Sequence, residues 1–361
     1  MTETPSGLLV VDKPAGCTSH DVVDQVRKIY QMSKVGHSGT LDPDATGVLL
    51  LALGKATRLA PFLQNLPKSY RAEAKFGVST STQDSSGEVV ATKPSSLTVA
   101  DVEAMTAQFE GEIQQIPPMV SAVKIDGEPL YKAARRGEEV DRPARTVRTY
   151  ELLVDRFDET AQTARIFVKC SSGTFIRTLV SDIGDRLGVG GHVTSIRRLS
   201  IGSFTEADVL DLRELERSSL EGCIAKLLTM RQAMRDFPEV TVEGDELAAV
   251  THGRPIAGIG QAKPKPQEAE VPTIRGTPLP QFLPGPGTEP AGLGLGMAGG
   301  LMPTRSGELP LMAQPRPGDR PAHEAGMTAG VPVAVLDLEG NLIAVYRRSK
   351  KGLMPAAVLV G

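Results

Sequence analysis

The most unusual stretch of the chain is GHSGTLDPDATGVL, residues 36–49. It places three glycines, a histidine and two aspartates directly before an apolar run. Glycine lets a backbone approach a ligand closely, and the Asp42-Pro43 step restricts the direction in which the Asp42 carboxylate points. Such a carboxylate is a candidate nucleophile or base, although an aspartate before proline also commonly caps a turn. The phosphate-loop spacings GxxxxGK(S/T) and GxGxxG do not occur here.

The segments around this stretch predict an α+β fold with mainly antiparallel strands. Helices are expected to begin at a Thr18 or Ser19 cap, at a Thr98 cap and at Phe175, the last running to Leu187. Apolar runs and period-2 alternation predict strands at residues 8–11, 48–53, 70–76, 151–156 and 164–170, and a hairpin from 331–336 and 342–346.

Charge is unevenly distributed along a chain whose formal net charge is −3. Basic residues dominate at 26–75, 165–200 and 347–351, whereas residues 206–246 are acidic. Such segregation lets one face bind phosphates while the whole molecule stays slightly negative. An ordinary solvated surface is the alternative, and charge by itself does not separate the two.

The composition indicates a globular protein and argues against a membrane-spanning or disulfide-rich one. The 361 residues are 40% hydrophobic and 23% charged, which is typical of a globular protein with two or three domains. No apolar run approaches the roughly 20 residues that a membrane helix needs, and the first residues lack a signal-peptide layout. The cysteines, Cys17, Cys170 and Cys223, form no CxxC pair, which argues against a disulfide framework and a zinc site. We therefore expect a cytoplasmic protein without a bound metal.

Residues 261–330 differ from the rest in composition. About half of the chain's 27 prolines lie there, among many glycines. Such a segment favours neither helix nor sheet, so we expect a disordered insertion. The apolar residues at 293–302 leave a docking motif as the alternative reading.

Residues 36–49 closely resemble the GH(S/T)GTLDPxATGVL stretch of the TruB family of bacterial tRNA pseudouridine synthases. Further blocks resemble the same family and follow in its order over about 210 residues. They are DKPxGxxS at 12–19, KxYxA at 68–72, DxxG at 84–87, PPxxSAxK at 117–124, CSxGTYIRT at 170–178 and RRL at 197–199.

The resemblance implies a pseudouridine synthase fold and isomerisation of uridine 55 in the T loop of tRNA, without a cofactor. It assigns three catalytic residues: Asp42 as the nucleophile, Arg177 as its ion-pair partner, and Tyr70 as the ring that stacks on uracil and a candidate to handle the C5 proton. Taken alone, Arg177 also suits a helix surface and Tyr70 suits a core. Attack by Asp42 on C1′ of the ribose and attack on C6 of the base are both open at this stage.

The resemblance also implies how the RNA is held. The target base must be flipped out of the folded loop. His37 then corresponds to a histidine that inserts into the RNA stack, and Leu199 and Phe175 to an apolar wall beside the base. Lys13 either supports the loop that carries Asp42 or contacts RNA. The remaining histidines are expected to be structural: His20, His192, His252 and His323.

Three positions depart from the family pattern. Phe175 and Val120 stand where tyrosine is usual. Because phenylalanine has no hydroxyl, residue 175 cannot take any role that the tyrosine hydroxyl has in the family. Asp44 stands where an apolar residue is typical and adds negative charge near Asp42.

The resemblance divides the chain into a catalytic domain at 1–235 and a C-terminal domain at 236–361. The first includes a basic segment at about 123–148 that resembles a mobile insertion clamping the T stem. The second is similar to a small PUA-like β-barrel, interrupted by residues 261–330. Its basic cluster at 347–351 is placed to touch the acceptor stem, and we expect a monomer.

Three other functions compete with this prediction. A pseudouridine synthase acting on ribosomal RNA is the nearest, but the Gly36–Gly39 prefix and the basic segment favour the T loop. A non-catalytic RNA-binding or tRNA-folding module is a second, opposed by the presence of Asp42, Tyr70 and Arg177. A hydrolase using Asp42 would need a second carboxylate or a histidine as a partner, and the one nearby candidate, Asp44, lies on the same turn.

Overall fold

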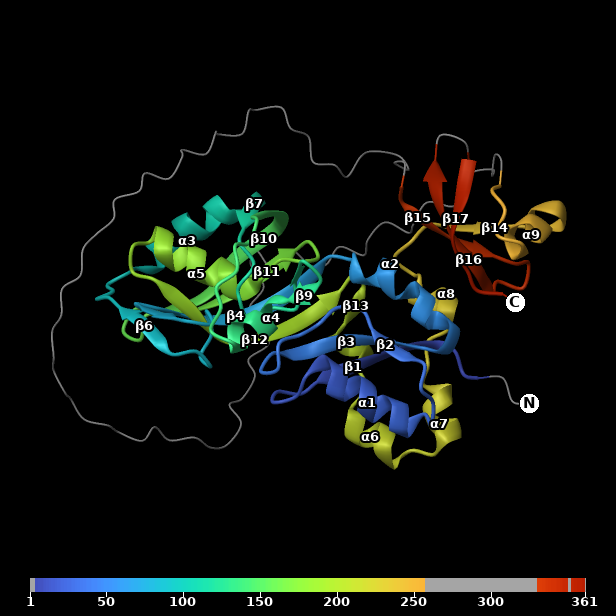
Figure 1. Ribbon diagram of the computed structural model, residues 1–361, viewed down its shortest axis with the longest axis horizontal. Coiled ribbons are helices and arrows are strands. Elements are labelled where there is room, and N and C mark those ends of the chain that lie inside the picture. Colours follow the sequence, from blue (N-terminus) through green and yellow to red (C-terminus); the bar gives the residue numbers. More distant parts are fainter. Residues whose placement is uncertain (1–3, 257–329, 350–351, 361) are drawn as a thin grey trace. The chain divides into compact units, whose positions relative to one another are not determined.

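A nine-stranded sheet organises the fold, which this computed structural model describes for residues 4–256, 330–349 and 352–360 (Figure 1). Its order is β1-β3-β12-β4-β11-β10-β7, with β2 beside β3 and β13 beside β12. Neighbours are antiparallel except β3 and β12. The strands are β1 (Gly7–Lys13), β2 (Val35–His37), β3 (Thr46–Leu53), β4 (Lys68–Phe76), β7 (Gly111–Gln115), β10 (Arg145–Asp158), β11 (Thr163–Cys170), β12 (Gly191–Ile201) and β13 (Phe204–Thr205). The predicted α+β class with mainly antiparallel strands is confirmed.

Strands β1 and β3 are buried on both faces. Leu8 and Val10 point into one core, whereas Leu9 and Val11 point into another. Because successive side chains of a strand face opposite sides, a continuous apolar run is what such a position requires. Helices α1 (Ser19–Ile29), α6 (Leu212–Arg217) and α7 (Leu220–Ala225) cover the second face (Figure 1).

A separate core lies over the other half of the sheet. Helices α3 (Val99–Thr106) and α5 (Ile176–Arg186) pack there against β4, β10, β11 and β12 (Figure 1). Thr18 and Thr98 form capping boxes at the starts of α1 and α3, as predicted. Phe175 is the residue before α5, so the third predicted helix begins one residue later than expected.

The segment between β7 and β10 contains short elements. They are β8 (Lys124–Ile125), β9 (Glu128–Pro129) and α4 (Leu130–Arg135). Residues 145–148, the end of the basic segment predicted at 123–148, form the start of β10 and pair with β7. Residues 145–148 therefore belong to the nine-stranded sheet and not to an insertion outside it.

Smaller elements complete the described chain. They are β5 (Val78–Thr80), β6 (Val89–Thr92), α2 (Ala60–Gln64), α8 (Met230–Ala233) and the 3₁₀ turns η1 (Gly54–Leu59), η2 (Ala107–Phe109) and η3 (Glu206–Asp208).

The C-terminal part forms a four-stranded sheet. Its order is β14 (Glu239–Thr241), β15 (Pro332–Leu336), β16 (Leu342–Ser349) and β17 (Gly352–Val358), accompanied by α9 (Gly244–Thr251). The predicted hairpin is β15–β16. The described strands leave this sheet open, so they do not confirm the expected barrel. The predicted insertion at 261–330 lies outside the described residues except for Gly330.

Gly47 is required where β3 runs parallel to β12. Its φ is +105°, and a Cβ added there would lie 2.2 Å from the carbonyl oxygen of Arg198. We expect Gly47→Ala to lower the free energy of unfolding by about 2 kcal/mol or more, measured by urea denaturation. Gly36→Ala is the control, because a Cβ on Gly36 meets no atom within 4 Å. Equal stability of the two variants would contradict this reading of the parallel pair.

Candidate active site

The loop that carries Asp42 connects β2 to β3 and is fixed on both sides of this residue. The backbone N–H of Leu41 donates to the Ser19 hydroxyl at 2.9 Å. The carbonyl of Pro43 accepts from the Gly16 N–H at 3.1 Å and from the Lys13 ammonium at 2.8 Å. The loop therefore presents the carboxylate from a backbone held by the chain segment 13–19.

Lys13 is completely buried and joins this loop to the segment 14–17. Its ammonium donates to the carbonyls of Pro14, Cys17 and Pro43 at 2.7–2.8 Å, and burial lowers its pKa. A side chain without accessible surface presents nothing to RNA. Of the two roles left open by the sequence, support of the loop is the one seen, and the assignment of Lys13 to substrate binding is corrected.

Arg177 holds the Asp42 carboxylate with two donors. Its Nε lies 2.8 Å from Oδ2 of Asp42 and its Nη2 lies 3.3 Å from Oδ1. Arg177 is 3% exposed, whereas the Asp42 side chain is 43% exposed. The expected ion pair forms, and its geometry leaves the carboxylate open on one side.

The rest of the Arg177 guanidinium is also bonded. It donates at 2.8 Å to the carbonyls of Thr82 and Val120, and Nη1 lies 3.3 Å from Oδ2 of Asp84. Burial opposes ionisation of Asp84, but hydrogen bonds from Ser86 and Thr82 outweigh it and lower the pKa of this carboxyl. Arg177 therefore links two carboxylates and two loops. Asp84 lies in the DxxG block, but the sequence did not indicate its contact with Arg177.

Asp42 faces a cavity of about 370 Å³. Of the predicted site residues, Asp42, Tyr70, Phe175 and Arg177 line this cavity together. The lining also includes four residues that the sequence analysis did not assign to the site: Lys68, Ser121, Ile196 and Arg198.

Tyr70 and Arg198 face each other across strands β4 and β12. Burial raises the pKa of the Tyr70 hydroxyl to about 12, so this group stays protonated at neutral pH. Arg198 is fully buried and donates to the carbonyl of Val48 in β3 and to those of Gly39 and Thr40 in the Asp42 loop. Because it also lines the cavity, Arg198 supports this loop from the cavity side. The RRL block contains Arg198, but a motif does not say which of two arginines points inward.

Ile196 is among the residues that line the cavity, and Leu199 is not. Residues 196 and 198 share a face of β12, while a register shift between Arg198 and Ser200 sets Leu199 apart from the ladder with β4. The register shift interrupts the regular alternation of side chains at Leu199, and the assignment of Leu199 to the apolar wall stays a prediction.

His37 lies at the end of β2, outside the lining of the cavity. Burial, followed by the charge of nearby Arg198, lowers the pKa of its imidazole and favours the neutral ring. Its Nδ1 is buried without a hydrogen-bond partner among the described residues. His192, by contrast, is bonded through Nδ1 to the Val78 carbonyl at 2.9 Å, which suits a structural residue.

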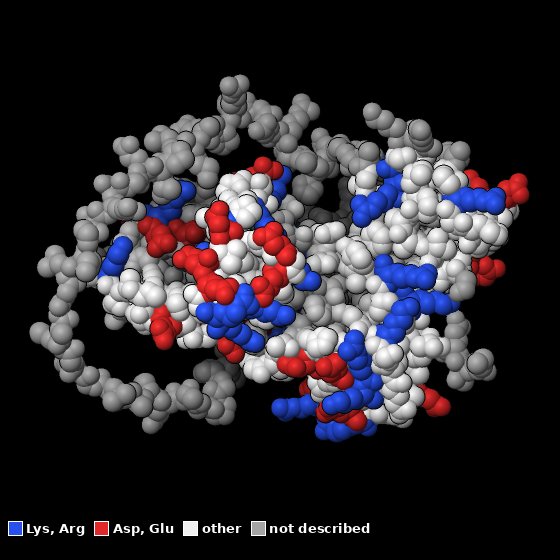
Figure 2. Space-filling view, in the orientation of Figure 1, with Lys and Arg blue, Asp and Glu red and all other residues white. Residues whose placement is uncertain are grey.

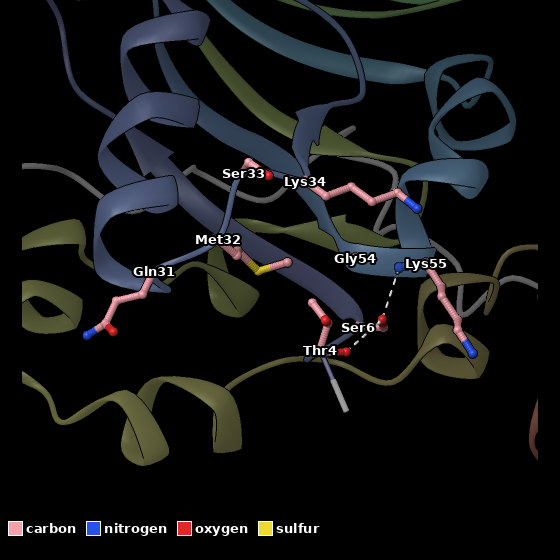
Figure 3. Close-up of a pocket in the computed structure, with 8 residues that line it drawn as sticks. All are labelled: Thr4, Ser6, Gln31, Met32, Ser33, Lys34, Gly54 and Lys55. Atoms are coloured by element: carbon pink, nitrogen blue, oxygen red, sulfur yellow. Dashed lines mark hydrogen bonds between the residues drawn. The ribbon is translucent and has the colours of Figure 1, made fainter. Parts of the chain in front are cut away.

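A second cavity, of about 630 Å³, lies away from these residues, at the far end of β3 (Figure 3). Thr4, Ser6, Gln31 and Lys55 are among the residues that line it. In Figure 3 a hydrogen bond joins the Ser6 hydroxyl to the Lys55 backbone. None of the predicted site residues borders this cavity.

Charged side chains gather in patches on the face shown in Figure 2. Blue side chains run over the elements from α2 to α1, with red side chains beside them near α1 (Figures 1 and 2). Within the described ranges, no helix is long and apolar enough to cross a membrane, and no three histidine, cysteine or acidic side chains cluster as metal ligands.

Family comparisons match most of the described chain. A model described as TruB family pseudouridylate synthase (N terminal domain) matches residues 27–176, and one described as tRNA pseudouridylate synthase B C-terminal domain matches residues 177–233. Curated proteins named tRNA pseudouridine synthase B are similar over 71% of the chain. One from Mycobacteroides abscessus is 44% identical over 86% of its own length, and one from Vibrio parahaemolyticus is 40% identical over 84%.

Solved structures share the fold. An archaeal box H/ACA sRNP Nop10-Cbf5 complex matches 99% of the chain and 87% of its own chain with a TM-score of 0.62 at 22% identity. A Cbf5-Nop10-Gar1 complex matches 99% and 86% with a TM-score of 0.64 at 25% identity.

Proposed function

The chain belongs to the TruB family of pseudouridylate synthases, and from this membership we propose that it converts uridine 55 in the T loop of tRNA to pseudouridine. The relatives' common name, tRNA pseudouridine synthase B, supports tRNA as the substrate. The observation that carries the proposal is the Asp42–Arg177 pair at a cavity that Tyr70 and Ile196 also line.

The reaction is an isomerisation with balanced atoms and electrons. The N1–C1′ bond of uridine breaks, the uracil turns, and C5 bonds to C1′. The C5 proton is lost and N1 gains one, so neither an oxidant nor a leaving group is needed. What the site must supply is a nucleophile, a means to hold the detached base, and a path for one proton.

Asp42 is the proposed nucleophile. Its carboxylate is accessible on the cavity side, and the fork of Arg177 fixes its orientation. Such preorganisation lowers the cost of reaching the reactive geometry. Attack on C1′ and attack on C6 both start from this carboxylate.

The cavity wall is proposed to hold the uracil. Tyr70 offers a ring for stacking and a protonated hydroxyl, and Phe175 and Ile196 offer apolar surface. Phe175 is fixed at the start of α5, because Gln115 accepts from its N–H at 3.0 Å and donates to its carbonyl at 3.2 Å. His37, with its neutral ring favoured, would stack in the RNA where the base has left.

The basic surfaces are proposed to contact the tRNA backbone. In the segment predicted as a T-stem clamp, Arg136 is paired with Glu128 and Glu138, so Lys124, Lys132 and Arg135 are the better candidates for phosphate contacts. A contact of residues 347–351 with the acceptor stem, action as a monomer and action in the cytoplasm belong to the same proposal.

The test is to incubate the full chain with an unmodified tRNA transcript and with ribosomal RNA fragments, and to map pseudouridine at every uridine. We expect conversion at uridine 55 alone. If only uridines of the ribosomal fragments were converted, ribosomal RNA and not tRNA would be the substrate. Tight binding of the tRNA with every uridine unchanged would make the protein a binding module.

A further inference from the structure

Lys68 is a buried cation in the active-site cavity for which the proposed mechanism has no use. It is 6% exposed and lies two residues before Tyr70 on β4, so both side chains face the cavity. Its Cε would lie 3.6 Å from a Cβ on Gly39, which places the side chain beside the Asp42 loop.

The ammonium group of Lys68 is bonded only to neutral groups. It donates to the carbonyls of Gln64 and Leu66, both at 2.8 Å, where α2 ends. None of the ion pairs among the described residues includes Lys68. The other two cations of the cavity are committed, Arg177 to Asp42 and Asp84, and Arg198 to backbone carbonyls.

A buried charge without a counter-charge is unfavourable. Burial, with the Arg198 guanidinium nearby, accordingly lowers the pKa of Lys68 to about 8. The amine is still mainly charged at pH 7. A ligand that brings a negative charge into the cavity would remove this penalty, whereas a neutral uracil carbonyl would not.

The cavity has a second group that lacks a partner. The hydroxyl of Ser121 is buried and forms no hydrogen bond within the described ranges, although Ser121 lines the same cavity. Buried polar groups are rarely left unpaired. The Lys68 ammonium has no negatively charged partner, and the Ser121 hydroxyl has no hydrogen-bond partner among the described residues. Together they indicate that the cavity binds a ligand with polar and anionic groups.

We propose that Lys68 binds a phosphodiester that flanks the flipped uridine. This inference rests on the proposed function, because it takes the cavity around Asp42 as the place where the nucleotide enters. A flipped nucleotide carries a phosphate on each side of its ribose, and each phosphate is a full negative charge at neutral pH. An ammonium ion is a point charge suited to such an oxygen. Lys68 is therefore a substrate-positioning contact, next to the carboxylate that reacts.

The test is a thermodynamic cycle that combines the Lys68→Met variant with RNAs in which one phosphate is replaced by a neutral methylphosphonate. Three T-stem-loop RNAs are used: one unmodified, one neutral on the 5′ side of the target uridine, and one neutral on its 3′ side. Single-turnover kcat/KM and Kd are measured for each pair. On the unmodified RNA, Lys68→Met should lower kcat/KM by about 10- to 100-fold. On one of the neutral RNAs, wild type and variant should agree within about twofold.

Lys93→Met is the matched control, because it removes the same charge from an exposed lysine outside the cavity. Lys68→Arg, which keeps the charge, should recover part of the loss and provides a folded variant if Lys68→Met unfolds. An equal loss for Lys68→Met on all three RNAs would overturn the phosphate contact. If the wild type converts no RNA, the proposed function fails, and the Kd values still decide whether Lys68 and the phosphate are coupled.

Discussion

Replacing Asp42 with asparagine is expected to reduce conversion of uridine by roughly 10⁴-fold or more while leaving tRNA affinity within about threefold of the wild type. The amide keeps the size of the carboxylate but is no nucleophile. Because the loop is held by Ser19, Gly16 and Lys13 through its backbone, the substitution should not displace it. Single-turnover conversion of an unmodified transcript and filter binding measure the two quantities.

Asp44→Asn is the matched control for this prediction. It removes the same charge two residues away, from an exposed side chain that does not line the cavity. We expect it to retain nearly full activity. Comparable loss in both variants would point to the charge of the loop rather than to one nucleophile. Full activity of Asp42→Asn would remove Asp42 from the mechanism altogether.

Arg177→Met is the second substitution with a large expected effect. It removes the donors to Asp42, Asp84 and two backbone carbonyls from a nearly fully buried position. Removing one partner of a buried ion pair usually lowers the free energy of unfolding by about 3–5 kcal/mol. Both carboxylates are partly exposed here, so we expect the free energy of unfolding to fall by about 2–3 kcal/mol. Conversion should fall by roughly 10²- to 10³-fold, because Asp42 loses its fixed orientation.

Arg177→Lys separates orientation from charge. A lysine ammonium cannot reproduce the two-donor fork, so this variant should regain part of the stability but little of the activity. Urea denaturation and single-turnover kinetics are compared, with Arg186→Met, at the exposed end of the same helix, as the control. Full activity of Arg177→Lys would show that the fork does not matter.

Local sequence patterns predicted several of the helices and strands, and the family motifs predicted the central pair of the site. Capping residues at Thr18 and Thr98, alternation along β4 and the doubly buried run of β3 are local signals, and they persist in the structure. Asp42 and Arg177 were named together through the family motifs, and the structure brings them to 2.8 Å. These predictions succeeded because a motif preserves residue type and order.

Which side chains line the cavity follows from the packing of segments far apart in the chain. Leu199 and Ile196 are both apolar residues of one strand, but Ile196 is among the residues that line the cavity and Leu199 is not. Lys13 and Lys68 are both lysines at strand ends, yet one is enclosed by three carbonyls while the other lines the cavity. Burial and strand register arise from contacts between segments far apart in the chain. A residue's type and neighbours in sequence therefore do not determine them.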